Sequence, residues 1–111
     1  MIEKIILDYL SENASVPVSM MRAEKPPKKY IILEKTGSRK TNKVVTSTFA
    51  IQSYAPTLYQ AAELNEEVKS LMDEADTLTD VMAVKLSTDY NFTNTATKQP
   101  RYQAVFNITH Y

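Results

Sequence analysis

Apolar residues near the start of the chain recur at helical spacing, which predicts an amphipathic helix at the N-terminus. Its apolar face is formed by Ile2, Ile5, Ile6, Tyr9 and Leu10. Asn13 and Pro17 are expected to end it. A longer apolar stripe from Leu58 to Ala75 predicts a second helix, with Pro56 as an early helical residue, where its missing N–H costs nothing. Asn65 lies within that stripe, and the pattern gives no reason for a polar residue there.

Two segments between these helices have the composition of β-strands. Tyr30–Thr36 and Val44–Tyr54 are rich in β-branched and aromatic residues, and a hairpin is the simplest way to connect them. The polar segment between them, Gly37–Lys43, is predicted to be a seven-residue loop. The alternation of apolar residues over Val16–Met20 allows a further short strand, which Pro17 would confine to a sheet edge or a strand start.

The last third of the chain contains two runs in which apolar and polar residues alternate, as expected for strands with one buried face. One face of the first run carries Met82, Val84, Leu86, Thr88, Tyr90 and Phe92. One face of the second run carries Tyr102, Ala104, Phe106, Ile108 and His110. The polar segment Thr93–Gln99 separates them, so a C-terminal hairpin is predicted. This segment and Gly37–Lys43 are expected to be mobile, since they have no apolar anchor.

These elements predict a single α+β domain over residues 1–111. The expected order is α-β-β-α-β-β, with an antiparallel sheet of about four strands and both helices packed on one of its faces. The extra short strand near Val16–Met20 would add to that sheet. A core of this size is modest for a monomer, and assembly into an oligomer would bury more apolar surface.

The inventory of reactive residues argues against most enzymes and predicts no cofactor and no metal. With one Gly the chain has no glycine-rich phosphate loop, and with no Cys it has neither a thiolate nucleophile nor a cysteine zinc site. Its one histidine, His110, is interpreted as a strand residue. The acidic cluster at residues 73–80 lacks the pattern of a calcium loop and is interpreted as a solvated helix end. No apolar run approaches the roughly 20 residues that span a bilayer.

Charge is balanced overall, with 13 basic and 13 acidic residues, but it is unevenly distributed. Residues 22–43 contain eight basic and two acidic residues, whereas residues 63–80 contain seven acidic residues and one basic residue. Three interpretations are open: two solvated surfaces, opposite patches that meet between neighbouring subunits of a ring, or a basic loop that binds nucleic acid. For the second, the candidate interface residues are Lys28, Lys29, Arg39, Lys40, Lys43, Glu63, Glu66 and Glu67.

Several segments, taken in order, resemble a known family of small proteins from tailed bacteriophages and prophages. The segments are Leu33–Gly37, Thr48–Ala55, Ala61–Glu66, Asp89–Thr93, Arg101–Phe106 and His110–Tyr111. From about residue 30 to the C-terminus they are similar to the tail terminator, or tail completion, proteins of phages with long non-contractile tails. The likeness lies in the joint order of strand and helix patterns, because the family has no catalytic motif to match.

The resemblance implies a structural role. Proteins of this family form a hexameric ring on the last ring of the tail tube, end tube polymerisation and offer a surface to the head connector. The implied partners are other copies of the chain, the major tail tube protein and head connector proteins, with no membrane and no specific nucleic acid. The implied location is the virion, after assembly in the bacterial cytoplasm.

Three alternatives stay open beside this interpretation. The first is another head–tail adaptor ring of the phage neck. The second is a small α+β module that binds nucleic acid through the basic loop, with Tyr30 and Arg39 as contacts. The third is an enzyme for a small substrate, which would need a deep pocket lined with perturbed carboxylates.

Overall fold

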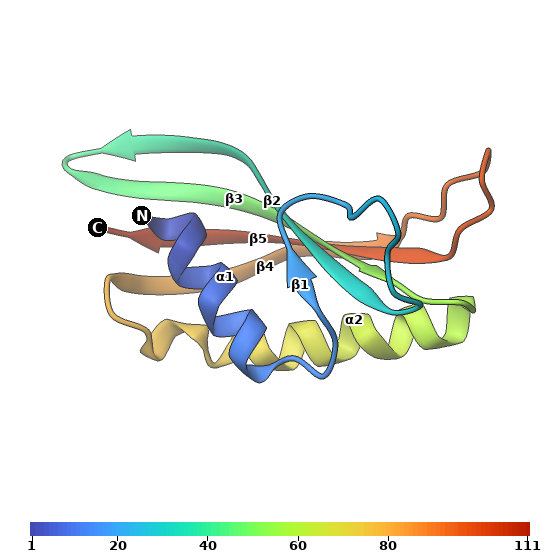
Figure 1. The fold of residues 1–111 in the computed structure, drawn as a ribbon. Coiled ribbons are helices and arrows are strands. Elements are labelled where there is room, and N and C mark those ends of the chain that lie inside the picture. The colour runs from blue at the N-terminus through green and yellow to red at the C-terminus, as the bar shows by residue number, and fades with distance from the viewer.

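A computed structural model describes all 111 residues and shows two helices packed on one face of a five-stranded sheet (Figure 1). The elements are α1 (Ile2–Asn13), β1 (Val18–Ser19), β2 (Tyr30–Thr41), β3 (Val44–Tyr54), α2 (Leu58–Asp73), the 3₁₀ turn η1 (Ala75–Thr77), β4 (Val81–Asn91) and β5 (Arg101–His110). The α+β class is therefore confirmed. The short strand β1 brings the number of strands to five, and its parallel pairing with β2 makes the sheet mixed.

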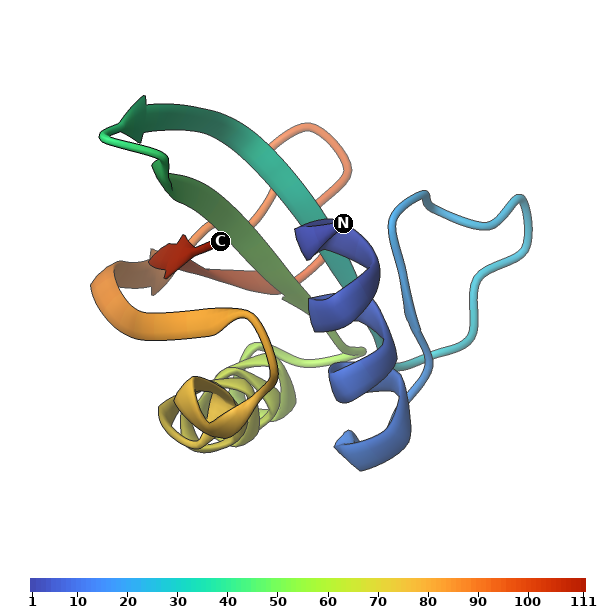
Figure 2. The ribbon, with the colours of Figure 1, turned by 90° about the vertical axis from the view of Figure 1, so that its left-hand side faces the viewer.

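The hydrophobic core lies between the helices and the sheet, whose order is β1-β2-β3-β5-β4 (Figure 2). Each layer contributes side chains that are at most 1% exposed: Ile6 and Leu10 of α1, Val68 and Met72 of α2, Phe49 and Ile51 of β3, and Phe106 and Ile108 of β5. The two helices are joined by a hydrogen bond of 2.6 Å from the Tyr9 hydroxyl to the Leu71 carbonyl. One face of the sheet is thus covered, and the other has no helix on it.

Both predicted helices are confirmed, with one correction at the start of α2. Pro56 lies before the helix, whose first residue is Leu58. Thr57 caps the helix instead, because its side-chain oxygen accepts a hydrogen bond of 3.2 Å from the backbone N–H of Gln60. This bond satisfies one of the free donors at the helix start, which a proline in that place could not do.

The prediction of a seven-residue loop at Gly37–Lys43 is wrong. β2 continues to Thr41, which pairs with Val44, and the chain reverses over Asn42 and Lys43 alone. Both turn residues have positive φ, 50° and 68°, as in the two-residue turns that suit the twist of a hairpin. Polar residues form strand here because β3 offers a backbone partner to each of them, from Ser38 opposite Ser47 to the turn. We call residues 37–48 the arm; it extends from one end of the molecule (Figure 1).

The predicted C-terminal hairpin is confirmed, and so is the buried face of β5, but the single face predicted for β4 is wrong. In β5, Ala104, Phe106, Ile108 and His110 are buried as expected. β4 has two register shifts against β5, between Val81 and Ala83 and between Leu86 and Thr88. Each extra residue moves the following side chains to the opposite face. The six residues expected on one face of β4 are therefore divided between the two faces, and most of them are exposed.

Candidate interaction surfaces

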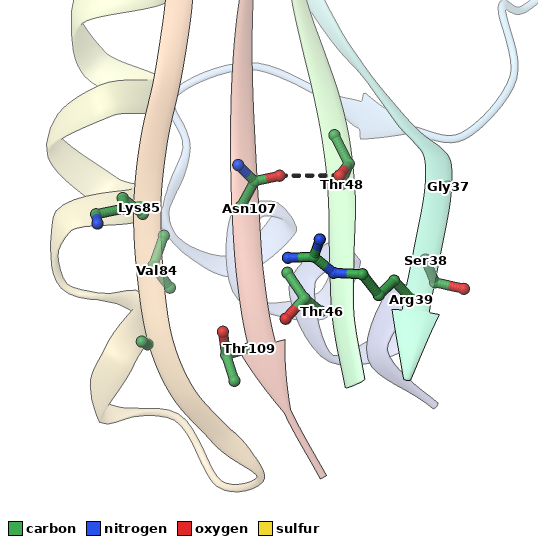
Figure 3. Close-up of a pocket in the computed structure, with 10 residues that line it drawn as sticks. Gly37, Ser38, Arg39, Thr46, Thr48, Val84, Lys85, Asn107 and Thr109 are labelled. Carbon is green, nitrogen blue, oxygen red and sulfur yellow. Dashed lines mark hydrogen bonds between the residues drawn. The ribbon is translucent and has the colours of Figure 1, made fainter. Parts of the chain in front are cut away.

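The face of the sheet without helices forms a polar hollow between the arm and β4, with a volume of about 720 Å³ (Figure 3). Its floor consists of Thr46 and Thr48 of β3 and Asn107 and Thr109 of β5. The Thr48 hydroxyl donates a hydrogen bond of 2.9 Å to the Asn107 side-chain oxygen. The Arg39 side chain extends from β2 across β3, and Lys85 of β4 lies on the opposite rim. The hollow is therefore hydroxyl-rich with cationic sides.

The other end of the same face is occupied by aromatic rings. Tyr30 stacks on Tyr54 with ring centroids 4.5 Å apart and planes at 8° to each other, and the Arg101 guanidinium lies 4.3 Å from the centre of the Phe92 ring. Tyr30 is only 4% exposed. Its ring therefore has no free face on which a nucleotide base could stack, so the nucleic-acid alternative loses one of its two expected contacts.

The basic residues predicted for an interface lie at opposite ends of β2. Lys28 and Lys29 are exposed just before this strand begins, and Arg39, Lys40 and Lys43 belong to the arm at its far end. A strand rises about 3.3 Å per residue, so these two groups are roughly 35 Å apart. None of the five side chains takes part in an ion pair within the subunit.

The acidic residues of α2 are also divided. Glu67 accepts hydrogen bonds from the Ser15 backbone N–H at 2.9 Å and from the Ser15 hydroxyl at 2.8 Å, which fastens the end of α1 to α2. Glu63 and Glu66 instead line a pocket of about 290 Å³ beside the β4–β5 hairpin. We call it the socket; its lining residues are Tyr59, Ala62, Glu63, Asn65, Glu66, Asp89 and Tyr102.

Lys69 partly neutralises the socket. Its ammonium lies 2.8 Å from a Glu66 carboxylate oxygen and 3.0 Å from an Asp89 carboxylate oxygen. Hydrogen bonding to Glu66 is the main cause of a raised pKa for Lys69, and hydrogen bonding to Asp89 adds to it. Glu63 is in no ion pair, so three carboxylates face a single ammonium group.

Asn65 accounts for the break in the apolar stripe of α2. It is 1% exposed, and its side-chain amide donates a hydrogen bond of 3.0 Å to Asp89 of β4. Its side-chain oxygen Oδ1 is buried and has no hydrogen-bond partner in the subunit. Sequence reasoning singled out Glu63 and Glu66 but missed Asn65, Asp89 and the two tyrosines. The one available signal was a polar residue in the middle of a buried helical face.

His110 is a buried strand residue, as predicted, and it is paired with a serine. Its Nδ1 lies 3.0 Å from the Tyr111 main-chain oxygen, and its Nε2 lies 2.7 Å from the Ser47 hydroxyl oxygen, within hydrogen-bond distance. Ser47 is fully buried, and neither residue lines the hollow or the socket. The pair therefore links β3 to β5 inside the sheet.

No group of three or more histidine and acidic side chains is placed to hold a metal ion. Neither helix has the length and apolar character that crossing a bilayer requires. A scan against protein-family models finds no match, and a search of curated proteins finds none either.

Proposed function

We propose that the chain is a structural protein of a phage virion, a tail terminator that forms a ring at the head-proximal end of a long non-contractile tail tube. The ring ends tube polymerisation and joins the tail to the head. The proposed partners are other copies of the chain, six in a ring, together with the major tail tube protein and head connector proteins. The ordered resemblance of the segments from Leu33 to Tyr111 supports the choice of this family.

The observation that carries the proposal is the difference in charge between the two ends of the subunit. The subunit measures 43 Å along its longest axis. The arm lies at one end, and the start of α2, which contributes most of the socket lining, lies toward the other (Figure 1). Two different, complementary patches on opposite ends favour a head-to-tail contact, and such a contact closes into a ring when its rotation allows. No ion pair joins the two patches within one subunit, so their charges are available for a contact between copies.

The free sheet edges give further support. β4 forms one edge over 11 residues, and β2 is covered by β1 only at Ile31 and Ile32, so most of its outer edge is unpaired. Unpaired edges invite pairing with another chain. An assembly that covers both edges in every subunit would remove this hazard.

The experiment combines the purified chain with tail tubes assembled from the major tail protein. Multi-angle light scattering at several concentrations is expected to show weak self-association of the free chain, and electron microscopy is expected to show a ring on one end of each tube. Capped tubes should stop elongating when more tail protein is added. A chain that stays monomeric and leaves tube growth unchanged would contradict the proposal. Binding to purified connectors in place of tubes would favour the neck adaptor.

A further inference from the structure

We propose that the socket receives the side-chain ammonium of Lys43 from the arm of a second copy of this chain. The inference deepens the proposed function, since it assigns the contact between neighbouring subunits, and it rests on that function only for the identity of the partner. It assigns Lys43 in the arm of one copy to the socket of the next copy.

The socket has an excess of anionic groups. Glu63, Glu66 and Asp89 line it, and ionised carboxylates only accept hydrogen bonds. The one ammonium group beside them, that of Lys69, is bound by Glu66 and Asp89, which leaves Glu63 without a cationic partner. The ligand that fits is a cation with several N–H donors.

The rings of Tyr59 and Tyr102 make the socket suitable for a long cationic side chain. Aromatic faces attract an ammonium group, and they also pack against the methylene groups of a lysine stem. Lys69 cannot fill this role, because its ammonium is already held by Glu66 and Asp89. The excess of carboxylates over ammonium groups is therefore left for a cation from outside the subunit.

Lys43 is the cation best placed to leave its own subunit. It occupies the second position of the two-residue turn at the tip of the arm, where it is exposed and in no ion pair. Its φ of 68° is one that favours glycine, and Asn-Gly is the preferred pair in such turns. A lysine is thus held where its backbone is strained, at the outermost point of the arm. Arg39, by contrast, is directed across the hollow.

The arm cannot reach the socket of its own subunit, because the arm and the start of α2, which contributes most of the socket lining, lie toward opposite ends of the molecule (Figure 1). The same contact repeated from copy to copy is head-to-tail, with a different patch on each side. It pairs the cationic tip of one subunit with the anionic pocket of the next. That is the arrangement a closed ring requires.

The first experiment replaces Lys43 by glycine and uses Lys98 as the matched control. Lys98 is also an exposed lysine with positive φ, 57°, in no ion pair, but it lies in the loop between β4 and β5. Lys43→Gly and Lys98→Gly should each raise the melting temperature of the subunit by about 3 °C, because glycine relieves the turn. Only Lys43→Gly should weaken self-association, by about tenfold at low salt. Lys43→Arg keeps the cation and should associate nearly as the wild type does.

The socket is tested from its own side. Glu63 is exposed and unpaired, so Glu63→Gln should weaken self-association several-fold without changing the melting temperature. Glu24→Gln removes another exposed charge, from the connector before β2, and should change neither quantity. Equal association of the wild type, Lys43→Gly and Glu63→Gln, measured by sedimentation velocity, would overturn the proposal.

A second experiment joins the two groups directly. A water-soluble carbodiimide is added to a mixture of ordinary and ¹⁵N-labelled protein, and cross-linked peptides are identified by mass spectrometry. The expected product is an amide between Lys43 Nζ of one copy and the Glu63 or Glu66 carboxylate of another, recognised by its mixed labelling. Lys43→Arg should remove this product while self-association persists. Concentrated wild-type protein that gives no mixed product would overturn the proposal.

These results are distinguishable from a failure of the proposed function. A Lys43–Glu63 cross-link in a chain that does not bind tail tubes would support the contact between Lys43 and the socket and would contradict the tail terminator role. Lys43→Gly protein that caps tubes as well as the wild type would contradict the socket and leave the tail terminator role intact.

Discussion

β4 and β5 are the two strands of one hairpin, but β5 lies between two neighbours whereas β4 forms the sheet edge. β5 pairs with β3 at every residue from Arg101 to His110, and its Phe106 and Ile108 are 1% and 0% exposed. β4 pairs on one side only and has two register shifts, and its Leu86 is 42% exposed. Similar alternating sequences therefore have different environments within a single hairpin.

The difference shows how a second neighbour constrains a strand. A central strand must offer hydrogen bonds on both sides, so an extra residue would disrupt two ladders at once. An edge strand can accommodate extra residues, and its bulges hinder pairing with the edges of other molecules. The helices also contact the two strands differently. Apolar side chains of β5 pack against α2, whereas Asp89 of β4 is held by hydrogen bonds from Asn65 and Lys69.

The largest contrast is expected for Phe106 and Leu86, which lie directly opposite each other in the two strands. Phe106→Ala should lower the free energy of unfolding by about 3–5 kcal/mol, because it leaves a cavity in the core. Leu86→Ala should lower it by less than about 1 kcal/mol, because much of the side chain is already in water. Urea denaturation of the two variants is the measurement. Similar losses would mean that the β4 edge is buried in solution, as it would be in a stable oligomer.

Much of the fold follows from local pattern. The stripes of α1 and α2 and the alternation of β5 predict their elements because each of these packs one face against the core. The arm and the bulges of β4 were not predictable in this way. Polar residues of the arm form strand only because β3 lies beside them, and the bulged positions 82 and 87 have ordinary strand residues.

The socket was predictable only in part. The uneven charge indicated Glu63, Glu66 and the arm lysines, since charge can be counted along the chain. The remaining lining comes from distant segments: Asp89 reaches Asn65 across 24 positions, and Tyr102 enters from β5. An unpaired acceptor such as Asn65 Oδ1 is a property of three-dimensional packing. Only the break in the apolar stripe pointed to it.

The polar contact between β4 and α2 is expected to give the next largest effect. Asp89→Ala removes the acceptor for Asn65 and Lys69 and should lower the free energy of unfolding by about 1–2 kcal/mol. Hydrogen exchange should become faster in β4, while amides shared by β3 and β5 keep their protection. Asp89→Asn still offers a side-chain oxygen to these donors, so it should lower the free energy of unfolding by less. Uniform loss of protection over all strands would contradict a role confined to the edge.

The smallest effect is expected from titrating the same contact. Glu66 and then Asp89 hold the pKa of Lys69 above its ordinary value of 10.5, so the protonated form is favoured by folding. Stability from this lysine is therefore complete below 10.5 and is lost as the pH rises through the higher pKa of the folded state. The contact is largely at the surface, so the change should be under about 1 kcal/mol.

Comparing the wild type with Lys69→Met isolates this contribution from other groups that titrate at high pH, the tyrosines included. The difference in unfolding free energy between these two proteins should be largest near pH 9 and should shrink by pH 11.5, as the ammonium of the wild type loses its proton. The comparison can be repeated with both proteins carrying Phe106→Ala. The difference in unfolding free energy should then decrease with pH by the same amount, because the apolar contacts of β5 are independent of pH. A difference that stays constant over this range would show that Lys69 supports β4 through its methylene stem and not through its charge.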